Sequence, residues 1–98
     1  MDKDQELLGE GFADALEEIK KVRINRREQY GDTYSEDSSA FLYFQIENKL
    51  KRLKLQFKDF ELKREDKMLS VAKDSLIDLC CYSMFLIEKI KKIQDEIK

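Results

Sequence analysis

Apolar residues recur at every third or fourth position along most of the chain, and this spacing is typical of one face of an α-helix. The first such stretch covers about residues 4–28. Its apolar stripe consists of Leu8, Phe12, Ala15, Leu16, Ile19 and Val22. The segment Tyr30-Gly31-Asp32 follows, and glycine can adopt the left-handed conformation that ends a helix. The pattern therefore predicts a first helix that ends at this turn.

A second helix is predicted over about residues 40–62, with Ser38 or Ser39 as its N-cap. Its inner stripe consists of Leu42, Ile46, Leu50, Leu53, Phe57 and Phe60. Residues 63–66 are charged and have no apolar period, so we expect a short turn there before a third helix over about residues 67–97.

The third helix is apolar around most of its middle, which predicts that it is the central and most buried one. These apolar residues are Leu69, Val71, Ala72, Leu76, Ile77, Leu79, Cys80, Cys81, Phe85 and Leu86. At 1.5 Å per residue it extends about 46 Å, against about 35 to 38 Å for the other two, so its end overhangs them. The overhang carries Ile90, Ile93 and Ile97 at coiled-coil spacing, and this exposed seam predicts a homo-oligomer.

The composition supports an all-α fold: among 98 residues there is no proline, glycine occurs three times, and 41% charged residues balance 42% hydrophobic ones. We expect one helical domain over residues 1–98, a bundle of three long helices that assembles into a helical homo-oligomer. The net charge of −2 provides no field for duplex nucleic acid. No apolar stretch is long enough to cross a membrane, and residues 1–4 lack a signal peptide's apolar core, so we expect a cytoplasmic protein without a membrane partner.

The content of cysteine and histidine excludes several chemistries. Cys80 and Cys81 are adjacent in a helix, where a mutual disulfide would be strained, so both are expected to be reduced and buried. Because histidine is absent, the usual zinc sites and the Ser-His-Asp and Cys-His arrangements are excluded. There is also no glycine-rich phosphate loop. A bound metal would have to be a hard cation held by carboxylates.

The clearest candidate for chemistry is a set of opposite charges on the last two helices. Asp74 and Asp78 are four residues apart and interrupt an apolar stripe, so both are expected to point inward, where they need a positive partner. Lys49 and Arg52 are the candidates on the second helix, with Gln45, Asn48 and Gln56 nearby. One interpretation is a set of interhelical salt bridges that fixes the register. The other is a phosphate ligand held by Lys49 and Arg52, with Mg²⁺ bridging it to the aspartates.

The end of the first helix offers further contacts for a ligand. Arg26 and Arg27 can bind an anion, and Tyr30 can stack on a base beside Asp32. The alternative interpretation is that the two arginines only complement the helix dipole. The lysine-rich run of residues 49–54 is interpreted as a solvated helix face, because acidic residues soon follow it.

The order of these motifs resembles the phage and prophage family called nucleotide modification associated domain 1. That family's pattern is a YGD turn, a K-x-x-R-L helix and a D-x-x-x-D-L-x-x-Y helix, and the resemblance covers about residues 23–86. The matching positions are Tyr30, Gly31, Asp32, Lys49, Arg52, Leu53, Asp74, Asp78, Leu79 and Tyr82. The protein would then act in the host cytoplasm if it is phage-encoded.

More distantly, the aspartate helix resembles that of MazG-type all-α nucleoside triphosphate pyrophosphatases. That likeness implies an oligomeric helical bundle in which Asp74 and Asp78 bind Mg²⁺. Those enzymes carry an E-x-x-E pair on the preceding helix, whereas this chain has Lys49 and Arg52 there. A cationic pair cannot bind Mg²⁺, which disfavours hydrolysis but leaves phosphate recognition intact.

These patterns lead to three hypotheses. The first is a phage-type nucleotide-binding protein, one form of which sequesters a nucleotide second messenger of bacterial defence without turnover. The second is a Mg²⁺-dependent pyrophosphohydrolase, in which Asp74 and Asp78 are metal ligands together with acids such as Glu47; the third is a structural helical adaptor. No residue is assigned as catalytic and no cofactor is expected outside the second hypothesis. The candidate ligand-binding residues are Arg26, Arg27, Tyr30, Asp32, Lys49, Arg52, Asp74, Asp78 and Tyr82.

Overall fold

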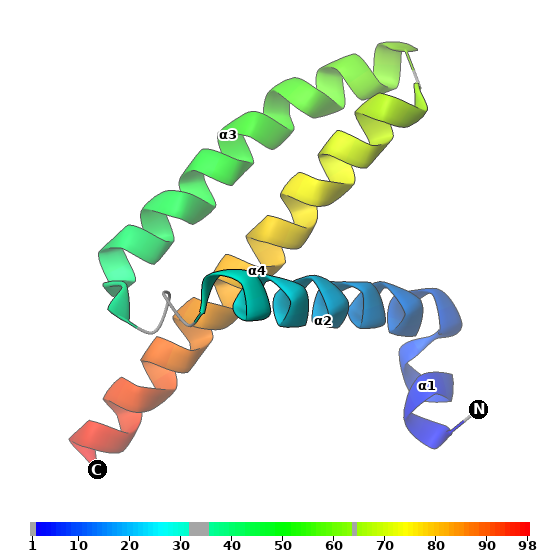
Figure 1. Cartoon of the computed structure of the whole chain (residues 1–98). Helices are drawn as coiled ribbons and strands as arrows, with labels where there is room; N and C mark the ends of the chain where they lie inside the picture. The colour runs from blue at the N-terminus through cyan, green and yellow to red at the C-terminus, as the bar shows by residue number, and fades with distance from the viewer. Residues whose placement is uncertain (1, 32–35, 64) are drawn as a thin grey trace. The chain divides into compact units, whose positions relative to one another are not determined.

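The computed structural model describes residues 2–31, 36–63 and 65–98, and the side chains of all of these except 59–63. Four helices account for nearly all of this part of the chain, and no strand occurs in it. The helices are α1 (Lys3–Leu8), α2 (Glu10–Tyr30), α3 (Ser39–Lys63) and α4 (Asp66–Ile97) (Figure 1). The prediction of an all-α protein is therefore confirmed.

The contacts divide the chain into two units, Met1–Thr33 and Tyr34–Lys98. The first unit contains α1 and α2, and the second contains α3 and α4. A single bundle of all the long helices stays a prediction, so each unit is described by itself.

In the first unit, Gly9 interrupts the helix that was predicted to run without a break over residues 4–28. Its φ of 93° lies in the left-handed region, which a continuous helix cannot contain, so α1 ends before it and α2 begins after it. The prediction of one helix here was wrong for this reason. The predicted end at Gly31 is confirmed: its φ is 72°, and its N–H donates a hydrogen bond of 2.8 Å to the carbonyl oxygen of Arg27.

The apolar stripe of α2 is accessible. No side chain of α1 or α2 is buried, Phe12 is 62% exposed, and Leu16, Ile19 and Val22 are half-buried. Within this unit only the short α1 contacts α2, and six residues cannot cover a stripe that runs over several turns.

The second unit is an antiparallel helical hairpin in which α3 and α4 lie side by side (Figure 1). Ser38 caps α3, because its Oγ accepts a hydrogen bond of 3.1 Å from the backbone N–H of Phe41. The ends of α3 and α4 agree with the predicted ranges to within one residue.

The two helices meet along a seam whose positions alternate in steps of three and four, as in an antiparallel coiled coil. The seam positions of α3 are Leu42, Ile46, Lys49, Leu53 and Gln56, all buried or half-buried. On the α4 side of the seam, Ala72, Ser75, Ile77, Cys81 and Phe85 are buried, and Met68, Asp78, Leu79, Tyr82 and Leu86 are half-buried. The hairpin core is therefore a narrow strip with several polar members.

The seam is narrower than the apolar surface predicted from the sequence. Leu50 and Phe57 of α3 are exposed, as are Leu69 and Leu76 of α4, because one neighbouring helix covers only one side of each. Cys81 is buried but Cys80 is exposed, so the prediction that both are buried was wrong; both are free thiols.

The C-terminal part of α4 extends past the start of α3, as its 32 residues against 25 require (Figure 1). Ile90, Ile93 and Ile97 are exposed on this extension, which confirms the predicted overhang. Among the described residues, no helix has the length and apolar character needed to cross a membrane.

Candidate functional site

The candidate site contains an ion pair between α3 and α4. The Lys49 Nζ donates a hydrogen bond of 2.9 Å to the Asp78 Oδ2, and the two side chains are only 14% and 18% exposed. The sequence predicted that cations of the second helix face the aspartates of the third, and the structure confirms this for Lys49 and Asp78. In the described part of the chain, Asp78 is the only polar partner of Lys49.

This pair shows which turns of α3 and α4 lie opposite each other. Leu42 lies two helical turns before Lys49, and Phe85 lies two turns after Asp78. In an antiparallel pair, Leu42 and Phe85 therefore stand opposite each other. In the other direction the same count brings Gln56 opposite Val71, and both of them line one pocket. The ion pair thus stands midway between an apolar end and a more polar end of the hairpin.

Asp74 does not point inward, contrary to the prediction. It is exposed, because the seam of α4 passes through Ala72 and Ser75, and position 74 falls on the flank between them and open water. Ser75, which the sequence did not single out, is the buried polar residue at this level.

Arg52 is also exposed and lies one turn after Lys49 on the same side of α3. Among the residues that the structure describes, it has neither an ion pair nor a hydrogen bond through its guanidinium. An exposed arginine beside a lysine that is withdrawn from water can accept an anion from solution without first breaking a salt bridge of its own.

Tyr82 occupies a seam position one turn after Asp78. Its ring is half-buried and meets the ring of Phe85 edge to face, with centroids 6.3 Å apart and planes at 78°. One edge of this aromatic pair is therefore used in packing within α4.

The candidates at the end of the first predicted helix belong to the other unit. On α2, Arg26 is half-buried, whereas Arg27 and Tyr30 are exposed; Asp32 lies outside the described residues. The structure therefore brings together Lys49 and Asp78, with Arg52 and Tyr82 within a turn of them, and leaves the contribution of Arg26, Arg27 and Tyr30 as a prediction.

Because the chain contains no histidine, its side chains that could bind a metal are the carboxylates and the thiols of Cys80 and Cys81. In the part of the chain covered by the structure, no group of three or more carboxylates or thiols is placed to hold a metal ion. Asp74 and Asp78 also differ in environment, because one is exposed and the other is paired with Lys49.

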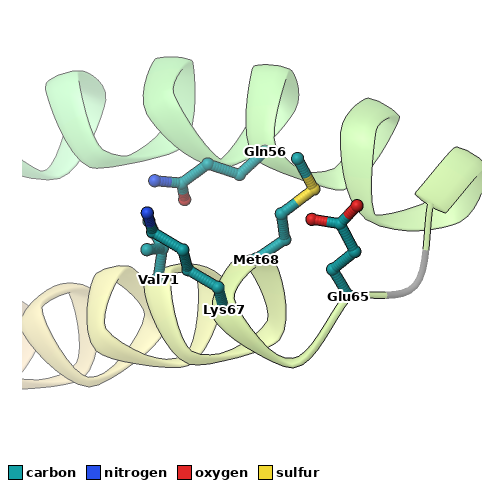
Figure 2. Close-up of a pocket in the computed structure, with 5 residues that line it drawn as sticks. All are labelled: Gln56, Glu65, Lys67, Met68 and Val71. Carbon is teal, nitrogen blue, oxygen red and sulfur yellow. The ribbon is translucent and has the colours of Figure 1, made fainter.

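A pocket that the sequence did not predict lies two turns from the ion pair, near the connection between α3 and α4. It has a volume of about 320 Å³ and is lined by Gln56, Glu65, Lys67, Met68 and Val71. Figure 2 shows the Gln56 amide reaching from α3 toward α4, while Lys67 and Met68 reach back toward α3. The Gln56 Oε1 is buried and has no hydrogen-bond partner in the described structure. The feature of the sequence that could have indicated this pocket is Gln56, a polar residue at a seam position.

Comparison of the chain with models of known families, with curated proteins and with solved structures finds no match.

Proposed function

We propose that the protein binds a nucleotide, or a nucleotide-derived phosphate compound, along the flank of the α3–α4 hairpin. The observation that carries this proposal is the exposed Arg52 guanidinium, which has no partner among the described residues and lies beside the Lys49–Asp78 pair. Arg52 would hold phosphate oxygens with its planar fork, and the Lys49–Asp78 ion pair beside it has no net charge. The resemblance of the chain's motif order to the nucleotide modification family implies the same ligand class.

Binding without turnover is the form of the proposal that the charges favour. A phosphoryl-transfer site needs carboxylates that are free to hold Mg²⁺. Here the Asp78 Oδ2 is held by Lys49. A cytoplasmic protein of this kind would sequester a nucleotide, and a second messenger of bacterial defence is one candidate.

Arg52→Gln is expected to weaken nucleotide binding at least tenfold, because it removes the charged fork while keeping a polar side chain. The measurement is titration calorimetry against a panel of nucleoside triphosphates and cyclic dinucleotides. Lys54→Gln is the matched control, since Lys54 is an exposed cation of the same helix on the side away from the seam.

Equal losses in the two variants would indicate a general charge effect and would contradict the proposed site. An absence of binding by the wild-type protein at about millimolar ligand would remove the proposal. Release of pyrophosphate above the uncatalysed rate in the presence of Mg²⁺ would replace it with the pyrophosphohydrolase hypothesis.

A structural role is the second candidate function, and the position of Lys49 favours it. A lysine at a core position of a coiled coil specifies register, and here its partner Asp78 comes from the facing helix. A helical adaptor of this type predicts that no nucleotide raises the melting temperature, whereas a nucleotide-binding protein is stabilised by its ligand.

Self-association is a further part of the proposal. The exposed Ile90, Ile93 and Ile97 lie on the overhang of α4, where α3 offers no cover, and a second copy of the chain would bury them. Ile93→Lys is expected to reduce the particle mass in light scattering to that of a single chain. Leu55→Lys is the control, because Leu55 is 70% exposed and lies away from the overhang. A monomeric wild-type protein would contradict self-association.

A further inference from the structure

We infer that the pocket beside Gln56 binds the nitrogen heterocycle of the nucleotide, and that the Gln56 amide recognises an N–H or NH₂ group on its edge. This inference rests on the proposed function, because it places the base and the phosphates of one ligand on the same flank of the hairpin.

The first argument is the state of Gln56. Its Oε1 is buried and has no hydrogen-bond partner among the described residues. A buried acceptor that is left unpaired lowers stability, so such groups are normally paired in the functional state of a protein. A ligand with an N–H donor would pair it, and the Nε2 of the same amide can donate to a neighbouring ring nitrogen. An amide forms this two-bond contact with the edge of a nucleobase such as adenine.

The second argument is the shape and lining of the pocket. Its volume of about 320 Å³ is at the lower end of the range for small-molecule sites, which suits one heterocycle better than a large ligand. Met68 and Val71 supply apolar wall, and the polarisable thioether of Met68 packs well against a flat ring (Figure 2). Glu65 and Lys67 complete the lining with opposite charges.

The third argument is continuity with the phosphate site. Gln56 lies one turn after Arg52 and two turns after Lys49, so the three side chains follow one side of α3 over about 10 Å. On α4, Lys67, Val71, Asp74 and Asp78 are spaced by four, three and four residues and form one stripe. The pocket lies between the two helices at one end of this flank, and the Lys49–Asp78 hydrogen bond connects them at the other end. A nucleotide with its base at Gln56 would direct its phosphates toward Arg52.

The direct test uses nucleosides and the methyl group of Met68. The chain has three methionines, so its ¹³C-methyl spectrum is simple, and Met84, which is exposed and four turns further along α4, serves as an internal control. Adenosine is expected to shift the Met68 signal and leave the Met84 signal in place.

Purine riboside lacks the amino donor and is expected to bind at least tenfold more weakly. Gln56→Leu is expected to abolish this difference. An unchanged Met68 signal in about 10 mM adenosine, or equal binding of the two nucleosides, would overturn the inference.

Calorimetry separates this inference from the proposed phosphate site. Gln56→Leu is expected to weaken ATP binding at least tenfold while leaving tripolyphosphate binding unchanged, whereas Arg52→Gln is expected to weaken both. If Gln56→Leu binds ATP as well as wild type, the base pocket is refuted and the phosphate site stands. If adenosine shifts Met68 but Arg52→Gln binds ATP normally, the phosphate site is refuted and the pocket stands. The Gln56→Leu variant is expected to have a melting temperature no lower than that of wild type, because it places an apolar residue at a seam position.

Discussion

Asp78→Asn is expected to lower the free energy of unfolding by about 3 kcal/mol, which is the lower end of the cost of breaking a buried ion pair. The substitution keeps the size and shape of the side chain but removes its charge. The Lys49 side chain is 14% exposed, so its ammonium group then keeps its desolvation cost and loses its anionic partner. Chemical unfolding in urea, followed by circular dichroism, measures the change.

Asp74→Asn is the matched control for this prediction. It is the same substitution one turn earlier on the same stripe of α4, but at an exposed position, so we expect a change within about 0.5 kcal/mol. Equal effects of the two substitutions would mean that the ion pair contributes no more than a surface charge does.

Replacing both partners, as in Lys49→Met with Asp78→Leu, is expected to restore most of the stability that Asp78→Asn loses. An apolar pair of similar volume avoids the desolvation cost of both charges. The double variant removes one positive and one negative charge, so the net charge beside Arg52 is unchanged and phosphate binding through Arg52 is expected to persist.

The helices were predictable because their apolar periodicity is strong and their ends carry local signals. Gly31 and Ser38 act through their own backbone or side chain, so the sequence alone identifies a helix end and a cap. Gly9 is the exception: it begins a short run that contains a second glycine, Gly11, which stays helical. The choice between a helical and a left-handed glycine depends on the surrounding chain and not on residue type.

Which side of α4 packs against α3 was less predictable from the sequence. A helix that is apolar around most of its circumference does not indicate which strip meets its neighbour. The seam through Ala72 and Ser75 became apparent only with α3 in place, and it left Asp74 on the flank while Asp78 remained within reach of Lys49. Two carboxylates on one stripe thus have different environments.

The ion pair was predictable because charge complementarity can be read from residue types, whereas the pocket was not. A cavity depends on how far each side chain fills the space between two helices, and in this register Gln56, Met68 and Val71 leave part of that space open. The sequence marked Gln56 as polar on the correct side of α3 but gave no reason to expect a cavity beside it.

Leu42→Ala is expected to lower the free energy of unfolding by about 3 to 4 kcal/mol, the sum of lost hydrophobic transfer and an unfilled cavity. Leu42 has no exposed surface, and the register of the hairpin places it opposite the buried Phe85. Leu55→Ala, at a position that is 70% exposed on the same helix, is expected to change stability by less than about 1 kcal/mol.

Comparison of Leu42→Ala with Leu55→Ala also tests whether α3 and α4 unfold together as one cooperative unit. Leu42 lies two turns from Lys49 and four turns from Gln56, so its truncation removes no group from the proposed ligand site. If α3 and α4 fold together, Leu42→Ala lowers the midpoint of the whole transition, and at low temperature the folded fraction binds nucleotide with wild-type affinity. A loss of stability no larger than that of Leu55→Ala would mean that the seam near Leu42 is not formed in solution, and the register inferred for the Lys49–Asp78 pair and the Gln56 pocket would have to be abandoned with it.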